Sequence, residues 1–163
     1  MSTEKNLKEA FAGESQANRK YLAFAKKADE EGYSTVAKLF RATAEAETIH
    51  AHAHLRILGE IKSTRENLRS AVDGETYEFT KMYPDFIEEA EKEGHKQAQK
   101  SFELANEAEK VHGDLFKKAL ENIDQKDNME FFLCEVCGNI VLNSPPDKCS
   151  ICGAPASKFR KID

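Results

Sequence analysis

Two glutamate–histidine pairs with the same spacing are the residues of this chain best suited to chemistry. Glu47 and His50 form the first pair, and Glu109 and His112 form the second, 62 positions later (109 minus 47). Residues three apart lie on one face of an α-helix, so each pair points a carboxylate and an imidazole the same way. Two such faces inside a helical bundle supply the ligands of a two-metal centre. The shared frame, E-A-E-x-(I/V)-H, makes the pattern much more specific than one Glu-x-x-His.

A further glutamate precedes each pair and belongs to the same repeat. Gly13-Glu14 matches Gly74-Glu75 at an offset of 61 positions. With the two pairs, Glu14 and Glu75 bring the set to four carboxylates and two imidazoles. This oxygen-rich set suits a pair of iron or manganese ions better than a structural zinc ion. The sequence therefore predicts a di-metal site with six repeated ligands.

Glu78 breaks the symmetry of the repeat. It lies three positions after Glu75, on the same helical face, and the first half of the chain has no acid at the matching place. We expect Glu78 to be a seventh ligand beside one metal only. Tyr21 and Tyr83 follow the first glutamates by about two turns. Their hydroxyls could hydrogen-bond ligand carboxylates, and the alternative is that both rings are simply core aromatics.

The four cysteines of the chain form a second candidate metal site. They occur as two Cys-x-x-Cys-Gly knuckles within the last thirty positions, at Cys134, Cys137, Cys149 and Cys152. Four thiolates at this spacing bind one metal ion tetrahedrally, which is more typical of this arrangement than a disulfide framework. The spacing alone leaves the metal open, because a zinc ribbon has the same pattern.

The elements that must position these residues are four long helices. Helical periodicity predicts helices over residues 4–31, 35–58, 63–93 and 96–123, with glycines as three of the stops. Residues 125–128 read as a polar hinge, and the chain has no helical period from Met129 onward. We expect a mainly α protein with two domains: a four-helix bundle over 1–124 and a small four-cysteine metal module over 129–163.

The third helix carries one more residue than the first. The extra position falls between Glu75 and Tyr83, and Pro84 cannot donate a hydrogen bond to the carbonyl of Thr80. A single inserted residue is accommodated in a helix by a π-bulge, and such bulges favour functional sites. The sequence therefore predicts a bulge around residues 79–83.

Composition and charge exclude several functional classes. The chain has 163 residues, 33% of them charged, and a formal net charge of -5. Basic and acidic residues are interspersed, so we expect no nucleic-acid binding. No segment approaches the roughly 20 apolar residues of a membrane span, and the start of the chain lacks an apolar signal region. We expect a cytoplasmic protein without membrane contact.

The combined motifs resemble the rubrerythrin family. The likeness covers nearly the whole chain and rests on AGESQA at 12–17, Glu47-x-x-His50, Gly74-Glu75-x-x-Glu78, Met82-Tyr83-Pro84, Glu109-x-x-His112 and the two cysteine pairs. It implies a ferritin-like bundle with a di-iron centre and a rubredoxin-like iron centre held by four thiolates. It also implies a peroxidase in which hydrogen peroxide is reduced to water, with electrons from NAD(P)H passing through a reductase and rubredoxin.

The resemblance also implies particular roles for four side chains. In relatives of this type, one iron moves between a glutamate of the third helix and a histidine of the second when the centre is reduced. In this chain, Glu78 and His50 would exchange in that way. Tyr21 and Tyr83 would orient the ligands.

The connector between the second and third helices predicts a domain-swapped homodimer. In a bundle of this type the two helices run the same way, so the connector must retrace roughly 27 Å along the axis. Residues 59–64 span only about 20 to 24 Å at full extension. Helices one and two of one chain should therefore pair with helices three and four of another. We also expect the cysteine module to reach its nearest di-iron site across this dimer.

Other functions fit parts of the same pattern. The bundle alone would suit a ferroxidase, an oxidase or an iron-handling ferritin-like protein, although iron storage does not need an attached one-electron centre. A zinc ribbon on a helical scaffold would suit a binding protein that is not an enzyme. The metals, and the reaction with peroxide or oxygen, distinguish these possibilities.

Overall fold

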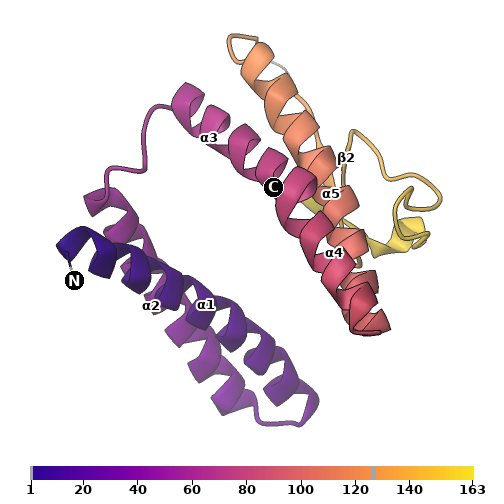
Figure 1. Ribbon diagram of the computed structural model, residues 1–163. Helices are drawn as coiled ribbons and strands as arrows, with labels where there is room; N and C mark the ends of the chain where they lie inside the picture. The colour runs from indigo at the N-terminus through magenta and orange to yellow at the C-terminus, as the bar shows by residue number, and fades with distance from the viewer. Residues whose placement is uncertain (1, 126–127) are drawn as a thin grey trace. The chain divides into compact units, whose positions relative to one another are not determined.

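The structure is a computed structural model that describes residues 2–125 and 128–163. The chain divides into two compact units, Met1–Lys62 and Ser63–Asp163, and each unit is described by itself. The first is a helical hairpin (Figure 1). The second is another helical hairpin followed by a small β module.

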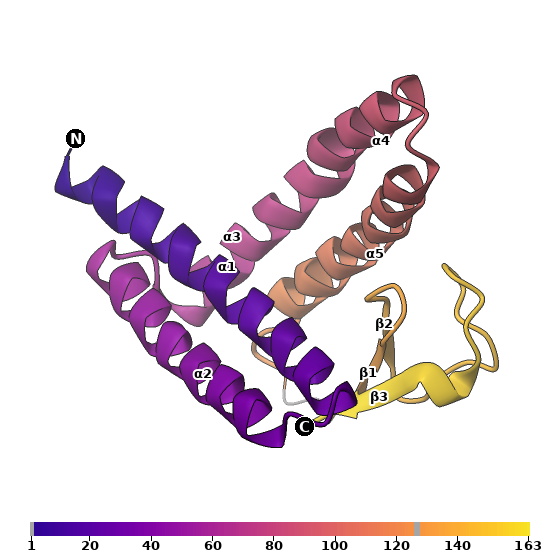
Figure 2. The same ribbon diagram turned by 90° about the horizontal axis from the view of Figure 1, so that it is seen from below.

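The first unit consists of helices α1 (Thr3–Glu30) and α2 (Ser34–Ile57), which lie side by side in both views (Figure 2). Ser2 caps α1 by accepting a hydrogen bond from the backbone of Lys5. Three alanines spaced seven apart in α2 are buried: Ala37, Ala44 and Ala51. Small residues at this spacing fall on one helical face and allow a close approach of α1.

One polar side chain ties the two helices of the first unit together. The Asn18 amide donates hydrogen bonds to the carbonyl of Ala44 (2.7 Å) and to the hydroxyl of Thr48 (2.8 Å). Because Thr48 follows Glu47 directly, these bonds fix the register of the helix faces that carry Glu14 and Glu47.

The second unit contains the other two predicted helices. The third helix runs as α3 (Thr64–Tyr77), a π-helical turn η1 (Glu78–Met82) and α4 (Tyr83–Lys92), and it packs beside α5 (Lys96–Glu121). A capping box between Ser63 and Glu66 starts α3, as its sequence predicts. The fourth helix ends at Glu121, slightly earlier than expected.

The π-helical turn confirms the expected bulge. The backbone N–H of Tyr83 donates to the carbonyl of Glu78, five residues earlier. Pro84 has no N–H to offer, and the Thr80 hydroxyl bonds back to the carbonyl of Thr76 (2.5 Å). The inserted residue is thereby absorbed without ending the helix, and Glu78 lies at the start of the π-helical turn.

The internal repeat extends to the aromatic packing inside each hairpin. Tyr21, Phe24 and Phe40 form a cluster in the first unit, with ring centroids 5.6 to 6.4 Å apart. Each residue has a counterpart 62 positions later, and the second cluster of Tyr83, Phe86 and Phe102 has centroids 5.6 to 6.3 Å apart. The two hairpins are thus built on the same plan.

The β module is a three-stranded antiparallel sheet. Strands β1 (Phe131–Cys134), β2 (Ile140–Leu142) and β3 (Phe159–Ile162) have the order β2-β1-β3, and a short 3₁₀ helix, η2 (Ala156–Lys158), precedes β3. Phe132 pairs with Val141 on one side and with Lys161 on the other. Within the described residues, no helix is long and apolar enough to cross a membrane.

Candidate metal centres

The first carboxylate–histidine group lies on the helices of the first unit. Glu14, Glu47 and His50 offer ligand atoms that all lie within 4.8 Å of one another. The Nδ1 atom of His50 is 3.2 Å from Glu47 and 3.9 Å from Glu14. A hydrogen bond shared with Glu47 raises the pKa of Glu14, and the same bond lowers the pKa of Glu47. The His50 side chain remains 55% exposed.

The second group repeats this arrangement in a more buried setting. Glu75, Glu109 and His112 also lie within 4.8 Å of one another, and none of the three side chains is more than 21% exposed. The Nδ1 atom of His112 is 2.7 Å from Glu109 and 3.8 Å from Glu75. Burial, followed by the contact with Glu109, raises the pKa of Glu75 to about 7.

Two features of the second group fit a bound metal ion. The Oε2 atom of Glu75 is buried and has no hydrogen-bond partner in the described chain. A buried carboxylate oxygen without a partner is costly, and a cation supplies the missing interaction. His112 donates from Nε2 to a carbonyl oxygen, which can only accept, so we assign its proton to Nε2. Its Nδ1 lone pair then faces Glu75 and Glu109, as a metal ligand requires.

Glu78 lies close to the second group but outside the tight cluster of three. Burial raises the pKa of Glu78, with a further contribution from the charge of Glu109, while His112 opposes it. The structure thus places the unrepeated carboxylate beside the second group, in agreement with the asymmetry expected from the sequence. Its role as a ligand stays a prediction.

The two tyrosines lie in the aromatic clusters of their hairpins. Burial raises the pKa of Tyr83, and the charges of Glu109, Glu78 and Glu75 add to the effect, so its hydroxyl lies in the field of the second group. Among the described residues, neither Tyr21 nor Tyr83 makes a side-chain hydrogen bond. Their predicted contacts with ligand carboxylates remain predictions.

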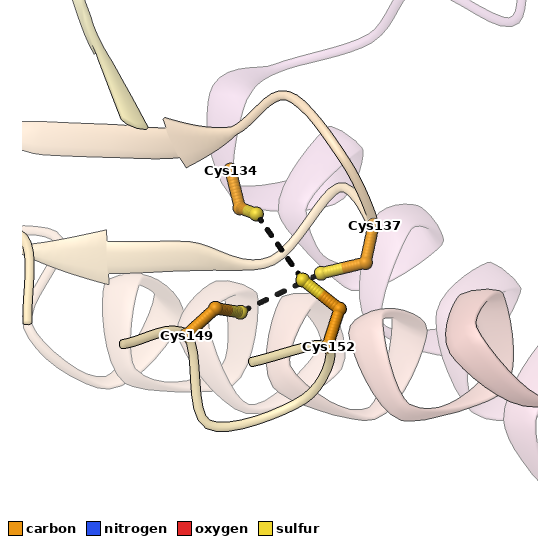
Figure 3. Close-up of side chains that lie close together, drawn as sticks. All are labelled: Cys134, Cys137, Cys149 and Cys152. Carbon is orange, nitrogen blue, oxygen red and sulfur yellow. Dashed lines mark hydrogen bonds between the residues drawn. The ribbon is translucent and has the colours of Figure 1, made fainter. Parts of the chain in front are cut away.

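The four cysteines converge on one point of the β module (Figure 3). Their sulfur atoms lie within 4.8 Å of one another, and all four thiols are free. Cys134 and Cys152 are 3.7 Å apart at sulfur, and Cys137 and Cys149 are 3.6 Å apart, well beyond a disulfide bond length. This is the closed four-thiolate set of a mononuclear metal site.

The two knuckles have the same backbone turn. Gly138 and Gly153 each follow the second cysteine of a pair and have φ angles of 81° and 74°, which residues with a Cβ rarely adopt. Their N–H groups donate to the carbonyls of Cys134 and Cys149 at 2.9 Å. The glycines thereby close the turns that present the sulfur atoms.

The sulfur atoms differ in their surroundings. Burial raises the pKa of Cys137 and Cys152. Burial acts in the same direction on Cys149, but N–H donors from Cys152, Ile151 and Asn139 outweigh it and lower its pKa to about 6. The Cys149 thiol is therefore prepared to ionise and bind a metal.

The β module contacts the second group of its own chain. The Nε2 atom of His112 donates to the carbonyl of Gly138, at 2.9 Å. We expected the module to approach a metal group across the dimer, so this part of the prediction was wrong for the second group. The first knuckle thus lies against His112, although Gly138 and His112 are 26 positions apart in the sequence.

Sequence reasoning missed two residues of this junction. The sequence predicts no role for the carbonyl of Gly138 and does not single out Asn139, which donates to Cys149. The available signal was positional: both residues follow directly on a cysteine knuckle. The contact with His112 has no local signature, because it joins residues 26 positions apart.

Comparisons with known families place both parts of the chain. The family described as rubrerythrin matches residues 5–120, and the family described as the rubredoxin-like domain of rubrerythrin matches residues 132–160. These two regions contain the carboxylate–histidine groups and the four cysteines, respectively.

Individual relatives match over nearly the whole chain. Nigerythrin of Nitratidesulfovibrio vulgaris is 41% identical, with 97% of this chain and 85% of the relative covered. A rubrerythrin of Porphyromonas gingivalis is 36% identical, with 98% of this chain and 90% of the relative covered. Structures of nigerythrin in a partially reduced and in a fully reduced, all-ferrous state share 40% identity and cover 99% of this chain and 87% of theirs. Their TM-scores are 0.62 and 0.61.

Proposed function

Because this chain belongs to the rubrerythrin family, whose members are generally di-iron peroxidases, we propose that it reduces hydrogen peroxide to water. Its fold is a four-helix ferritin-like bundle followed by a small rubredoxin-like module. It has two carboxylate–histidine metal sites of the di-iron type and one four-cysteine site of the rubredoxin type. We further propose that the functional domains span residues 1–124 and 129–163.

The observation that carries the proposal is the bond between His112 and the first cysteine knuckle. The four-cysteine group lies one hydrogen bond, at 2.9 Å, from an imidazole of the second carboxylate–histidine group. A bundle that only stored iron would have no need of such a contact. A short path of covalent and hydrogen bonds is what one-electron transfer between two centres requires.

We propose that the repeated residues hold the two irons. Glu47 with His50 would anchor one ion, Glu109 with His112 the other, and Glu14 and Glu75 would complete the set. Iron at this site supplies electrons and Lewis acidity for cleavage of the peroxide bond. Glu78 would serve as a seventh ligand and alternate with His50 as the oxidation state changes; its place beside the second group supports this role.

We propose that the Tyr21 and Tyr83 hydroxyls orient the ligand carboxylates. The position of Tyr83 in the field of three of these carboxylates supports this role. Its raised pKa keeps the phenol neutral, so it can donate a hydrogen bond at ordinary pH. Tyr21 holds the equivalent place in the repeat.

The active form is proposed to be a domain-swapped homodimer. Each unit carries only three of the six repeated ligands in its own cluster. Exposed apolar residues on α2 support a partner surface that is missing from the single chain. Leu39 lies 11 positions before His50 and Ile57 lies 7 positions after it, so both are on the same helical face as His50. They are 66% and 68% exposed. Large apolar residues on the same helical face as a ligand set are expected to be covered in the assembled protein.

The electron supply and the compartment complete the proposal. Rubredoxin and an NAD(P)H-dependent reductase are proposed as donors to the four-cysteine iron, in the cytoplasm. A single iron ion bound by four thiolates accepts one electron at a time, and this supports one-electron donors of this kind.

Stopped-flow oxidation of the reduced protein tests the proposed substrate. The iron-loaded protein, reduced without air, is mixed with hydrogen peroxide in one series and with oxygen in another. We expect oxidation by peroxide to be at least tenfold faster at equal concentration. Faster reaction with oxygen would instead favour the alternative, a ferroxidase or oxidase.

A further inference from the structure

Asn139 is the one buried polar side chain among the described residues outside the carboxylate–histidine groups. Only 2% of its surface is exposed, and it is the largest fully buried side chain of the β module together with Cys134. Burial of an amide is costly unless its polar atoms have partners. Its partners are therefore the key to its role.

Asn139 interacts with three of the four cysteines. Its side-chain amide donates to the sulfur of Cys149, which belongs to the second knuckle, at 3.6 Å. Its backbone N–H bonds to the thiol of Cys137. Its carbonyl accepts from the backbone of Cys134, at 2.8 Å. One residue thus connects both knuckles.

We propose that the Asn139 side chain raises the reduction potential of the iron held by the four cysteines. A ferric ion with four thiolates carries one negative charge, and the ferrous form carries two. Reduction adds one electron from the external donor and needs no proton and no change of ligand. An N–H group directed at a thiolate sulfur stabilises the more negative form, which is the reduced one.

The location of the amide strengthens this effect. Because Asn139 is almost fully buried, water does not screen its dipole, and a hydrogen bond in such surroundings is stronger than one at the surface. The backbone donors to Cys149 come from Ile151 and Cys152, within its own knuckle. Asn139 is the donor that the other knuckle supplies, so its bond depends on a side chain and can be removed by substitution.

Reductive titration of the full-length, iron-loaded protein tests the proposal. From the proposed function, the proposal takes only the presence of iron at the four-cysteine site. The reduction potential is measured from the visible thiolate-to-iron absorption. Two variants, Asn139→Ala and Asn139→Leu, both remove the donor but change the side-chain volume in opposite directions. We expect both to lower the potential, so that the ferrous-to-ferric ratio at a fixed solution potential falls about five- to tenfold, where tenfold corresponds to 59 mV.

Ile151→Val provides a matched control. This substitution changes packing in the same knuckle as Cys149 and keeps the backbone donor to Cys149. The ferrous-to-ferric ratio at the same solution potential should therefore stay within about twofold of the wild-type value. The position and intensity of the absorption bands give a second readout, because the bands respond to donors at sulfur.

Three outcomes separate this proposal from the proposed peroxidase function. Potentials that stay unchanged in both variants, or that move in opposite directions with volume, would overturn the role of Asn139. A wild-type protein without a reducible thiolate–iron absorption would overturn both proposals. A lowered potential in both variants supports the role of Asn139 even if the wild-type protein fails to reduce peroxide.

Discussion

The two carboxylate–histidine groups have the same residue types at the same spacing, yet their surroundings differ. The first, at Glu14, Glu47 and His50, is open: the imidazole is 55% exposed. In the second, the imidazole of His112 is 18% exposed and bonds to the β module. The second also has an unrepeated carboxylate, Glu78, next to it. The repeat thus duplicates the ligands without duplicating the environment that controls their chemistry.

The difference arises from two local departures from the repeat. Glu78, an unrepeated carboxylate at the start of the π-helical turn, lies beside the second group. The β module, which has no counterpart in the first half of the chain, then covers the imidazole of that group. A symmetric ligand set can therefore serve a reaction that needs two inequivalent metal ions.

The largest expected effect comes from removing one ligand of each group. Glu47→Ala disables the first group and Glu109→Ala disables the second, so each variant alone should lose nearly all peroxide turnover. In a swapped dimer, each complete site draws the first group from one chain and the second from the other. Co-expression of both variants should then restore about one quarter of wild-type turnover, since half of the dimers are mixed and have one intact site.

The measurement is peroxide turnover per dimer in co-purified mixed dimers, selected with two different affinity tags; this pure mixed population should have about half of the wild-type value, because one of its two sites is intact. Mixed dimers that remain inactive, although they load the four-cysteine iron normally, would mean that each chain builds its own site. The swap would then be wrong, and the connector would have to span the distance within one chain.

Removal of the unrepeated carboxylate should have the next largest effect. Glu78→Ala makes the second group resemble the first, and we expect turnover to fall roughly 10- to 100-fold, as for other groups that tune a metal site. Glu107→Ala is the matched control, because Glu107 belongs to the repeat but is exposed. Steady-state assays of both variants at equal iron content provide the test; equal turnover would remove Glu78 from the mechanism.

The pH dependence of the metal-free protein should also separate the two groups. The pKa of Glu75 is raised from 4.5 to about 7, so the neutral carboxyl is the favoured form in the fold. The stability that this adds is fully present below about pH 4.5 and is lost as the pH rises through 7. The loss should be roughly 1 to 3 kcal/mol, at about 1.4 kcal/mol per pKa unit.

Urea unfolding of the metal-free protein between pH 5 and 8 measures this loss. Glu75→Gln should remove the part of the pH dependence that this carboxyl causes, because its amide does not ionise; Cys149, whose pKa is lowered to about 6, acts in the opposite direction in both proteins. Bound metal should reverse the trend, since a carboxylate must lose its proton before it can bind the ion. The assignment would be contradicted if the wild-type protein and Glu75→Gln changed in stability by the same amount between pH 5 and pH 8.

The smallest expected change in stability comes from one matched pair of residues on α2 and α5. Ala51 and Gly113 are 62 positions apart and both buried. A Cβ at Gly113 would lie 3.4 Å from the Phe79 ring and 3.5 Å from the Glu75 Cβ, in ordinary contact. Gly113→Ala should therefore stabilise the metal-free protein by up to about 1 kcal/mol, and Ala51→Gly should destabilise it by about as much. Thermal unfolding of both variants tests this; destabilisation by Gly113→Ala would mean that Phe79 cannot shift.

Much of the fold was predictable because its signals are local. The Ser63 cap, the glycine stops and the one-residue insertion before Tyr83 each act within a few residues. For that reason helix bounds and the π-helical turn emerged from sequence alone. The clustering of Glu14 with Glu47, and of Glu75 with Glu109, was predictable because two helical faces of known period must meet.

The junction between the metal centres was not predictable in the same way. The bond from His112 to Gly138 joins residues 26 positions apart, and no periodicity encodes such a contact. Asn139 is likewise inconspicuous in sequence, because an asparagine beside a turn usually serves the turn. Only its burial and its distance from Cys149 reveal a different role.

The bond between Gly138 and Asn139 has a practical consequence. The carbonyl of this single peptide group accepts from His112, while its N–H bonds to the thiol of Cys137. Polarising one end of a peptide group changes the donor strength of the other. The colour of the iron–thiolate centre should therefore shift when the carboxylate–histidine site is filled. The visible absorption of the protein would then report whether its carboxylate–histidine site holds iron, without any added dye.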